Sequence, residues 1–158
     1  TASKYKTKIK LHAKTEVRNF EKPLISIISD TIIGTSRKVC LSIVSNRNAN
    51  RFELLAKAPI KFKQFKVNDE ALKLDAGSAY VLTIGSGTIV SYFRTSENER
   101  IDLEFVVDKN QQFDIDILEV KYDLYSNEAF NIQPRLKTMI PMPFVLNDAT
   151  VIKTNIQF

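Results

Sequence analysis

The feature that most constrains the fold is an alternation of apolar and acidic side chains over residues 101–124, IDLEFVVDKNQQFDIDILEVKYDL. A period of two places the apolar residues on one face of a β-strand and the carboxylates on the other. The two alternating runs are joined by the polar sequence KNQQ, which is typical of an antiparallel hairpin with one buried and one solvated face. The carboxylates on the solvated face are Asp102, Glu104, Asp114 and Asp116. The pattern predicts a β-protein and indicates no reaction.

Further runs of β-branched and aromatic residues recur along the chain, separated by turn-forming residues. They predict about nine strands, no helix and no internal repeat, which is typical of an all-β antiparallel sandwich, immunoglobulin-like or jelly-roll-like. The segment 24–33 is almost entirely apolar and is predicted to be a buried strand, whereas two prolines in 139–144 predict an edge or extended segment. The remaining predicted strands are 4–12, 37–45, 51–57, 60–68, 80–85, 88–94 and 149–158.

The apolar phase slips by one residue inside two of these segments. Ile60 and Phe62 are out of phase with Phe65 in one segment, and Ile117 is out of phase with Val120 in the other. An extra residue in one strand of a pair produces such a slip. We therefore predict β-bulges at 63–64 and at 118–119.

The 158 residues are expected to form a single domain that spans 1–158 and has been excised from the C-terminus of a longer chain. The net charge is +5, partly because lysines occupy every second position from 4 to 10. These lysines fit a basic arm for nucleic acid or anionic lipid, and they fit better the solvated face of an edge strand. In IKFKQFK (60–66) the alternation sends the phenylalanines to the core, so no nucleic-acid partner is expected.

The chain has few residues of the types that carry out catalysis or bind metals. It has one histidine, His12, and one cysteine, Cys40, which cannot form a disulfide within the chain or a zinc site of the usual kind. Cys40 is expected to be a small buried residue. Asp114 and Asp116 fit a calcium site less well than a solvated strand face, paired with Lys or Arg of neighbouring strands. We expect no catalytic residue, no metal and no cofactor.

Tyrosines near the ends of strands are candidates for carbohydrate stacking, alongside the alternative that they pack at sheet edges. The four candidates are Tyr80, Tyr92, Tyr122 and Tyr125. The last two lie where the strand pattern breaks and, together with the four alternating carboxylates, make up the candidate interaction surface. No apolar run is long enough to span a membrane, so direct membrane insertion is not expected.

Four segments of the chain resemble a known family. They read SNRNANRFEL (45–54), GTIVSYFRTSENERIDLEFVV (87–107), FDIDILEVKYDL (113–124) and PRLKTMIPMPFVLNDATVIKTNIQF (134–158). They look like the β-rich C-terminal domain of zinc aminopeptidase-like membrane proteins of bacteria, which are related to the vacuolar membrane protease and the endoplasmic reticulum metallopeptidase type. The resemblance spans about residues 37–158.

The resemblance implies an accessory role. The zinc ligands and the general base of the family belong to its peptidase domain, and no segment here matches them. The chain is therefore expected to be a non-catalytic accessory or interaction domain, with the peptidase domain and membrane helices of its parent as partners. It is expected on the extracytoplasmic (periplasmic) side of a bacterial membrane. A carbohydrate- or protein-binding module is the alternative, and a basic nucleic-acid-binding domain is a third.

Overall fold

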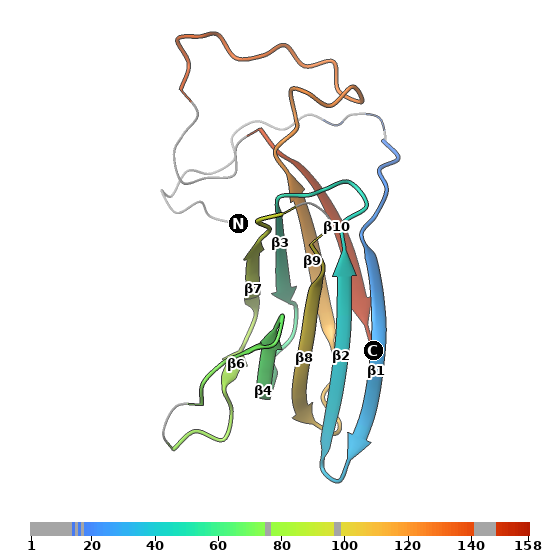
Figure 1. Ribbon diagram of the computed structural model, residues 1–158, viewed down its shortest axis with the longest axis vertical. Coiled ribbons are helices and arrows are strands. Elements are labelled where there is room, and N and C mark those ends of the chain that lie inside the picture. The colour runs from blue at the N-terminus through green and yellow to red at the C-terminus, as the bar shows by residue number, and fades with distance from the viewer. Residues whose placement is uncertain (1–13, 15, 17, 75–76, 97–98, 141–147) are drawn as a thin grey trace.

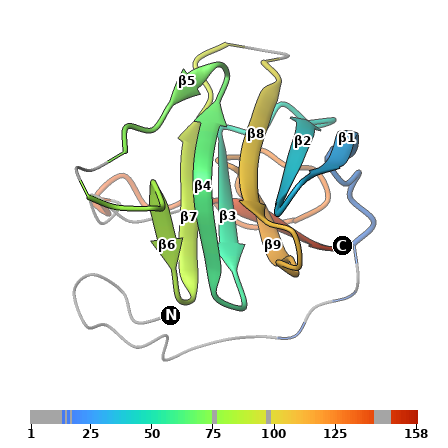
Figure 2. The ribbon, with the colours of Figure 1, turned by 90° about the horizontal axis from the view of Figure 1, so that it is seen from below.

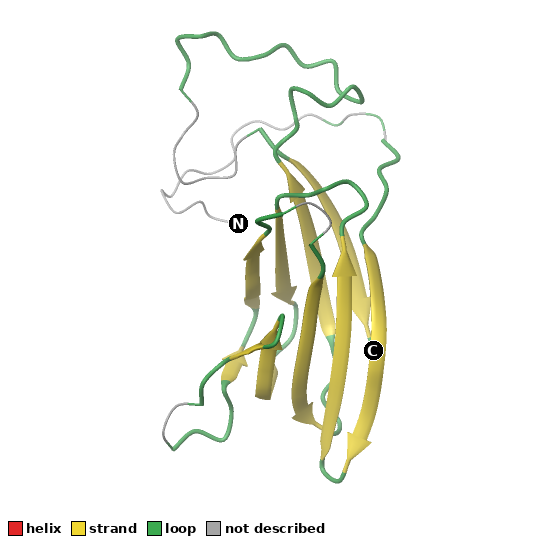
Figure 3. Ribbon diagram, viewed as in Figure 1, coloured by secondary structure: helices red, strands yellow, loops and turns green. Residues whose placement is uncertain are grey.

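The computed structural model describes residues 14, 16, 18–74, 77–96, 99–140 and 148–158. These residues form ten strands and no helix (Figure 3). All pairings are antiparallel, in two sheets. The larger sheet has the order β1 (Leu24–Ile33), β2 (Ser36–Val44), β8 (Ile101–Asp108), β4 (Ile60–Val67) and β5 (Glu70–Ala71), with β6 (Leu82–Ile84) also paired to β4. The smaller sheet has the order β10 (Thr150–Gln157), β9 (Asp114–Lys121), β3 (Arg51–Ala56) and β7 (Gly87–Phe93).

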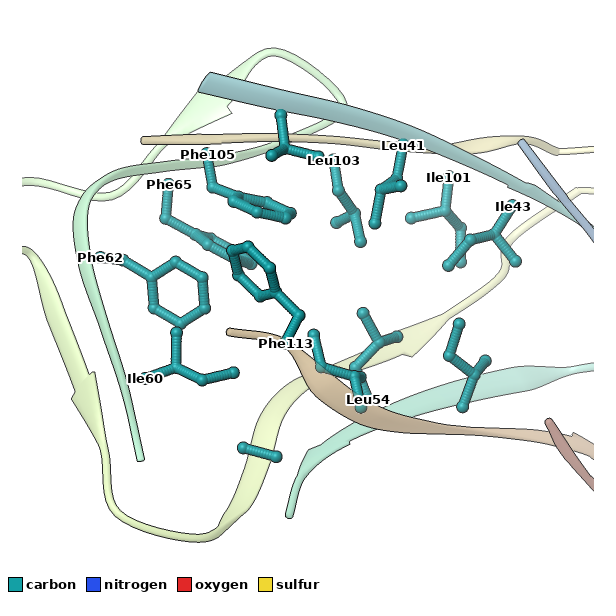
Figure 4. Close-up of a cluster of buried hydrophobic side chains, with 14 of the residues drawn as sticks. Leu41, Ile43, Leu54, Ile60, Phe62, Phe65, Ile101, Leu103, Phe105 and Phe113 are labelled. Carbon is teal, nitrogen blue, oxygen red and sulfur yellow. The ribbon is translucent and has the colours of Figure 1, made fainter. Parts of the chain in front are cut away.

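The two sheets pack face to face, which confirms the predicted all-β sandwich (Figure 1). Strands β3 and β8 bury every second side chain between the sheets, and the other inner strands bury most of theirs in the same way. In β2, for example, Val39, Leu41 and Ile43 are buried, as the alternation predicts. Phenylalanines from β4 and β8 meet Phe113 at one end of this core, and aliphatic residues of both sheets fill the other end (Figure 4).

The strands of 101–124 are present, but they do not pair with each other. Strand β8 pairs with β2 and β4 in the larger sheet, and β9 pairs with β10 and β3 in the smaller one. The predicted hairpin is therefore wrong: residues 109–113 cross from one sheet to the other. The period of two identifies a buried face and cannot tell whether two successive strands lie side by side or opposite each other across the core.

One of the two predicted bulges is present. The pairing of β4 with β8 shifts register between Phe62 and Gln64, so that Phe62 and Phe65 are both buried. Strand β9 instead pairs without interruption with β3 and β10, so the bulge predicted at 118–119 is wrong. The inward face of β9 continues from Ile117 to Glu119, a carboxylate that is fully buried.

The most apolar segment of the chain, 24–33, forms β1 and is not buried as predicted. It is an edge strand that pairs only with β2 among the described residues, and Leu24, Ile27, Ile28, Ile32 and Ile33 are 52–67% exposed. Cys40, predicted to be buried, is half-buried on the outer face of β2. The predicted strand 4–12 lies outside the described residues, as does most of 139–144.

Replacing Phe105 with alanine tests the aromatic end of the core. The ring of Phe105 is buried, and its centroid lies 5.3–6.2 Å from those of Phe62, Phe65 and Phe113. The cavity left behind should lower the free energy of unfolding by about 3–5 kcal/mol in urea denaturation. The matched control is Phe93→Ala, which removes an exposed ring over Arg51 and should cost about 1 kcal/mol or less. Equal losses in the two variants would contradict the core assignment.

Candidate functional site

The predicted acidic strip is divided between the two outer faces of the sandwich. Asp102 and Glu104 lie on β8 in the larger sheet, whereas Asp114 and Asp116 lie on β9 in the smaller sheet. The predicted hairpin would have put all four carboxylates on one solvated face, because it paired the two strands with each other. The structure does not bring them together, and they form no common surface.

On the larger sheet, Glu104 is held between two lysines. The Nζ atoms of Lys38 on β2 and Lys66 on β4 lie 2.8 and 3.0 Å from its carboxylate oxygens. Their hydrogen bonds lower the pKa of Glu104, with that of Lys38 the strongest influence. Asp102 is paired with Arg100, two residues earlier, at 2.8 Å. This confirms cross-strand pairing with lysine for Glu104.

On the smaller sheet, Asp116 and Asp114 are paired in the same way. Lys153 of β10 places its Nζ 2.5 Å from Asp116, and Asn155 donates hydrogen bonds to both carboxylates. Burial alone would raise the pKa of Asp116, but the bonds from Lys153 and Asn155 outweigh it and hold the pKa below its usual value. The pKa of Asp114 is lowered by Asn155 and then by Lys57. These carboxylates stabilise the sheet, and all four candidate acids have a basic partner.

The four tyrosines lie on separate parts of the molecule. Two hydroxyl groups are engaged within the chain, because Tyr80 donates to Asp108 at 2.9 Å and Tyr92 donates to Glu99. Tyr122 is exposed just after β9, and half-buried Tyr125 lies under the guanidinium of Arg135. None of the four is fully buried. Only Tyr122 and Tyr125 share one region, the connection between β9 and β10.

At the base of that connection lies a buried ion pair that the sequence did not predict. Glu119 of β9 is fully buried, accepts a hydrogen bond from Ser45 Oγ at 2.5 Å, and lies 3.1 Å from Nε of Arg47. The same guanidinium donates to the hydroxyl group and the carbonyl oxygen of Thr150 at the start of β10. The Thr150 hydroxyl in turn donates to Asp123 at 2.5 Å. This set of bonds, here called the Arg47 cluster, joins the β2–β3 turn to β9 and β10.

The Arg47 cluster also orders the residues around it. The Phe20 ring, from the chain before β1, lies 5.5 Å from the Arg47 guanidinium and 5.6 Å from the Phe130 ring. Arg135 holds the far end of the β9–β10 connection through an ion pair with Asp148. The first part of the connection is thus tied down at both ends. The long irregular loop at the top of Figure 1 is the part of this connection that the structure describes before β10, residues 122–140.

The β9–β10 loop exposes large apolar side chains. Ile140 is 88% exposed and Leu136 is 66% exposed, and Ile132 and Met139 are exposed as well. We call these four residues the loop patch. The described part of this connection, 122–140, has no strand or helix, and long connections of this kind are often binding loops. Large apolar side chains exposed on such a loop are typical of interaction sites. The length and the apolar content of the β9–β10 connection are the sequence signals for this patch. The two prolines in 139–144 favoured an edge strand instead.

Comparisons with known proteins do not identify a family: no protein-family model, no curated protein and no solved structure matches the chain. The resemblance to the zinc aminopeptidase-like proteins therefore stays a prediction. Within the described ranges, no group of three or more His, Cys, Asp or Glu side chains is arranged to hold a metal ion. The part of the chain that the structure describes also has no helix long and apolar enough to cross a membrane.

Substitutions in the Arg47 cluster test how much the cluster contributes to the free energy of unfolding. Arg47→Ala leaves Glu119 buried without its cation, so the free energy of unfolding should fall by about 3–5 kcal/mol in urea denaturation. The double variant Arg47→Met, Glu119→Leu removes both charges and should recover to within about 1 kcal/mol of the unaltered chain, or exceed it. A double variant as unstable as the single one would show that the loss comes from the missing bonds between Arg47 and Thr150, and not from an unpaired charge on Glu119.

Glu99 provides a test of pH dependence. The hydroxyl of Tyr92 and the backbone N–H groups of Thr95 and Ser96 lower its pKa to about 2 from the ordinary 4.5. Because the folded-state pKa is depressed, the stability that Glu99 contributes is present above pH 4.5 and is lost as the pH falls towards 2. Tyr92→Phe should raise this pKa towards 4.5, as measured by NMR titration of the carboxyl carbon.

Tyr80→Phe is the control for this titration. It removes a hydroxyl that donates to Asp108 instead, so it should leave the pKa of Glu99 unchanged. If Tyr92→Phe left the titration of Glu99 unchanged as well, the hydroxyl would not be the main cause of the depressed pKa.

Proposed function

We propose that this chain is a non-catalytic interaction domain, which serves as an accessory part of a membrane-associated zinc metallopeptidase. The observation that carries the interaction role is the loop patch. Its four apolar side chains are presented to solvent by a loop that the sandwich holds at its base. Apolar surface of this kind costs free energy in water, and contact with a partner removes that cost.

The anchoring of the loop supports a specific contact. Leu124 donates its backbone N–H to the Asp148 carbonyl at 3.0 Å, which brings the two ends of the loop together. Asn127 bonds to Asp123, and Arg135 is paired with Asp148. A loop whose base is ordered loses less conformational entropy when it binds than an unstructured segment does. This arrangement favours recognition of a defined surface.

The resemblance supplies the identity of the partner. In proteins of the zinc aminopeptidase-like type, the β-rich tail follows a peptidase domain and membrane helices. The loop patch suits an apolar surface of that peptidase domain, because all four of its side chains are apolar and uncharged. A carbohydrate-binding module is less well supported, since only Tyr122 and Tyr125 share one region and only Tyr122 is exposed.

The proposal predicts what the gene encodes before Thr1. The upstream sequence should contain apolar spans of about 20 residues and, before them, a constellation of His, Asp and Glu zinc ligands. Sequencing of the complete reading frame checks this. A reading frame in which Thr1 directly follows a cleaved signal peptide would refute the link to a membrane peptidase and leave only the interaction role.

The interaction role has its own test. The double variant Leu136→Asp, Ile140→Asp places charges on the loop patch, where both side chains are mostly exposed, so folding should be unaffected. Binding of the chain to the purified peptidase domain of the same protein should weaken by about tenfold or more, as measured by calorimetry. Val151→Asp, on the outer face of β10, is the matched control and should bind normally. Unchanged binding by the loop variant would rule out the patch as the contact.

A further inference from the structure

The sandwich has edge strands on both sides, and a tight turn connects the two sheets on one of them. At one side, β6 of the larger sheet leads through a tight turn into β7 of the smaller sheet (Figure 2). At the opposite side lie β1 and β10, each of which pairs with only one strand among the described residues. Their second edges carry backbone N–H and C=O groups that another strand can pair with.

The β1 edge lacks most of the features that normally prevent such pairing. Natural edge strands are protected by lysine, by proline, by being short or by a β-bulge, and β1 has only the bulge. Strand β1 has ten residues, LISIISDTII, with no lysine and no proline between Leu24 and Ile33. Its one charge, Asp30, is neutralised by a bidentate ion pair with Arg37. A bulge at Ile28 interrupts the register, but it leaves that side chain 67% exposed and 29–33 in regular pairing.

The apolar surface on β1 is large for a single strand. Five of its ten side chains are Leu or Ile with more than half of their surface in solvent. At roughly 100 Å² each they expose about 500 Å² per molecule on both faces of the strand. Pairing of two such strands through their backbones buries part of this surface, which gives an interface at or below the roughly 1,200 Å² lower limit of stable complexes. The groove between β1 and β10, about 520 Å³ in volume, continues this surface along the residues Leu24, Ile25, Ile27, Ile156 and Phe158.

A second copy of the same chain fits this edge by symmetry. A two-fold axis beside β1 and perpendicular to the sheet sets the strand against its own counterpart in antiparallel orientation, which is the orientation of every strand pair in the two sheets. The larger sheet would then continue from one molecule into the next. Both partners contribute apolar side chains, and the paired Asp30 leaves no uncompensated charge at the contact.

We propose that β1 is the dimer interface of this protein, and that two copies join their six-stranded sheets edge to edge through it. The contact lies on the opposite side of the sandwich from β6 and β7, and it uses no residue of the loop patch (Figure 1). The dimer therefore leaves both copies of the patch free to bind.

Sedimentation velocity over a concentration series tests the proposal with the whole chain. The mass should double as the concentration rises, and hydrogen exchange should show that amides of β1 gain protection over the same range while those of β10 do not. Ile28→Lys and Ile33→Lys place a charge on exposed positions of β1 and should raise the dimer dissociation constant by about tenfold or more. Val151→Lys, on the exposed face of β10, is the matched control and should dimerise normally.

Several results would overturn the dimer. A monomer at every concentration would do so, and protected β1 amides in such a monomer would assign the edge to a strand from within the chain. A dimer that survives both β1 substitutions, or one that Val151→Lys dissociates, would place the interface elsewhere. Thermal melts by circular dichroism establish that each variant is folded before its mass is interpreted.

Discussion

The buried ion pair between Arg47 and Glu119 is the interaction on which the top of the sandwich depends. A carboxylate that is fully removed from water is tolerated only with a cation and hydrogen-bond donors around it. Arg47 and Ser45 supply them from the β2–β3 turn, while Thr150 binds the remaining guanidinium nitrogens. One side chain thereby fixes the turn, the end of β9 and the start of β10 relative to one another.

This arrangement connects stability with the proposed function. The β9–β10 loop leaves the smaller sheet directly beside the Arg47 cluster, and Asp123 at its start is bonded to Thr150. Phe20 extends the cluster to Phe130 within the loop. The same contacts that compensate a buried charge therefore hold the loop patch in place. The two outer faces carry carboxylates that are paired with lysines or an arginine, whereas the loop and the β1 edge expose large apolar side chains.

The sequence was sufficient for properties that depend on neighbouring residues and insufficient for those that depend on distant ones. Alternation correctly placed Val39, Leu41 and Ile43 on one face of their strand, which is the buried face, and the phase slip located the bulge before Phe65. A similar slip at Glu119 had a different cause, because the cation that permits its burial lies 72 residues away. Strand β1 was predicted to be buried because its residues are mostly apolar. Its composition does not show whether a second sheet covers it. The loop patch and the Arg47 cluster share this dependence on tertiary structure.

The crossing at residues 109–113 has a consequence for how the molecule acquires its structure. Strands β8 and β9 are consecutive, and each is an inner strand of a different sheet: β8 lies between β2 and β4, and β9 lies between β3 and β10. Neither sheet can be completed from local contacts, since each lacks an inner strand until the segment 101–121 is in place. Folds dominated by such distant pairings form slowly. During synthesis, the apolar faces of the strands made earlier therefore stay exposed to solvent until this segment is available to pair in both sheets.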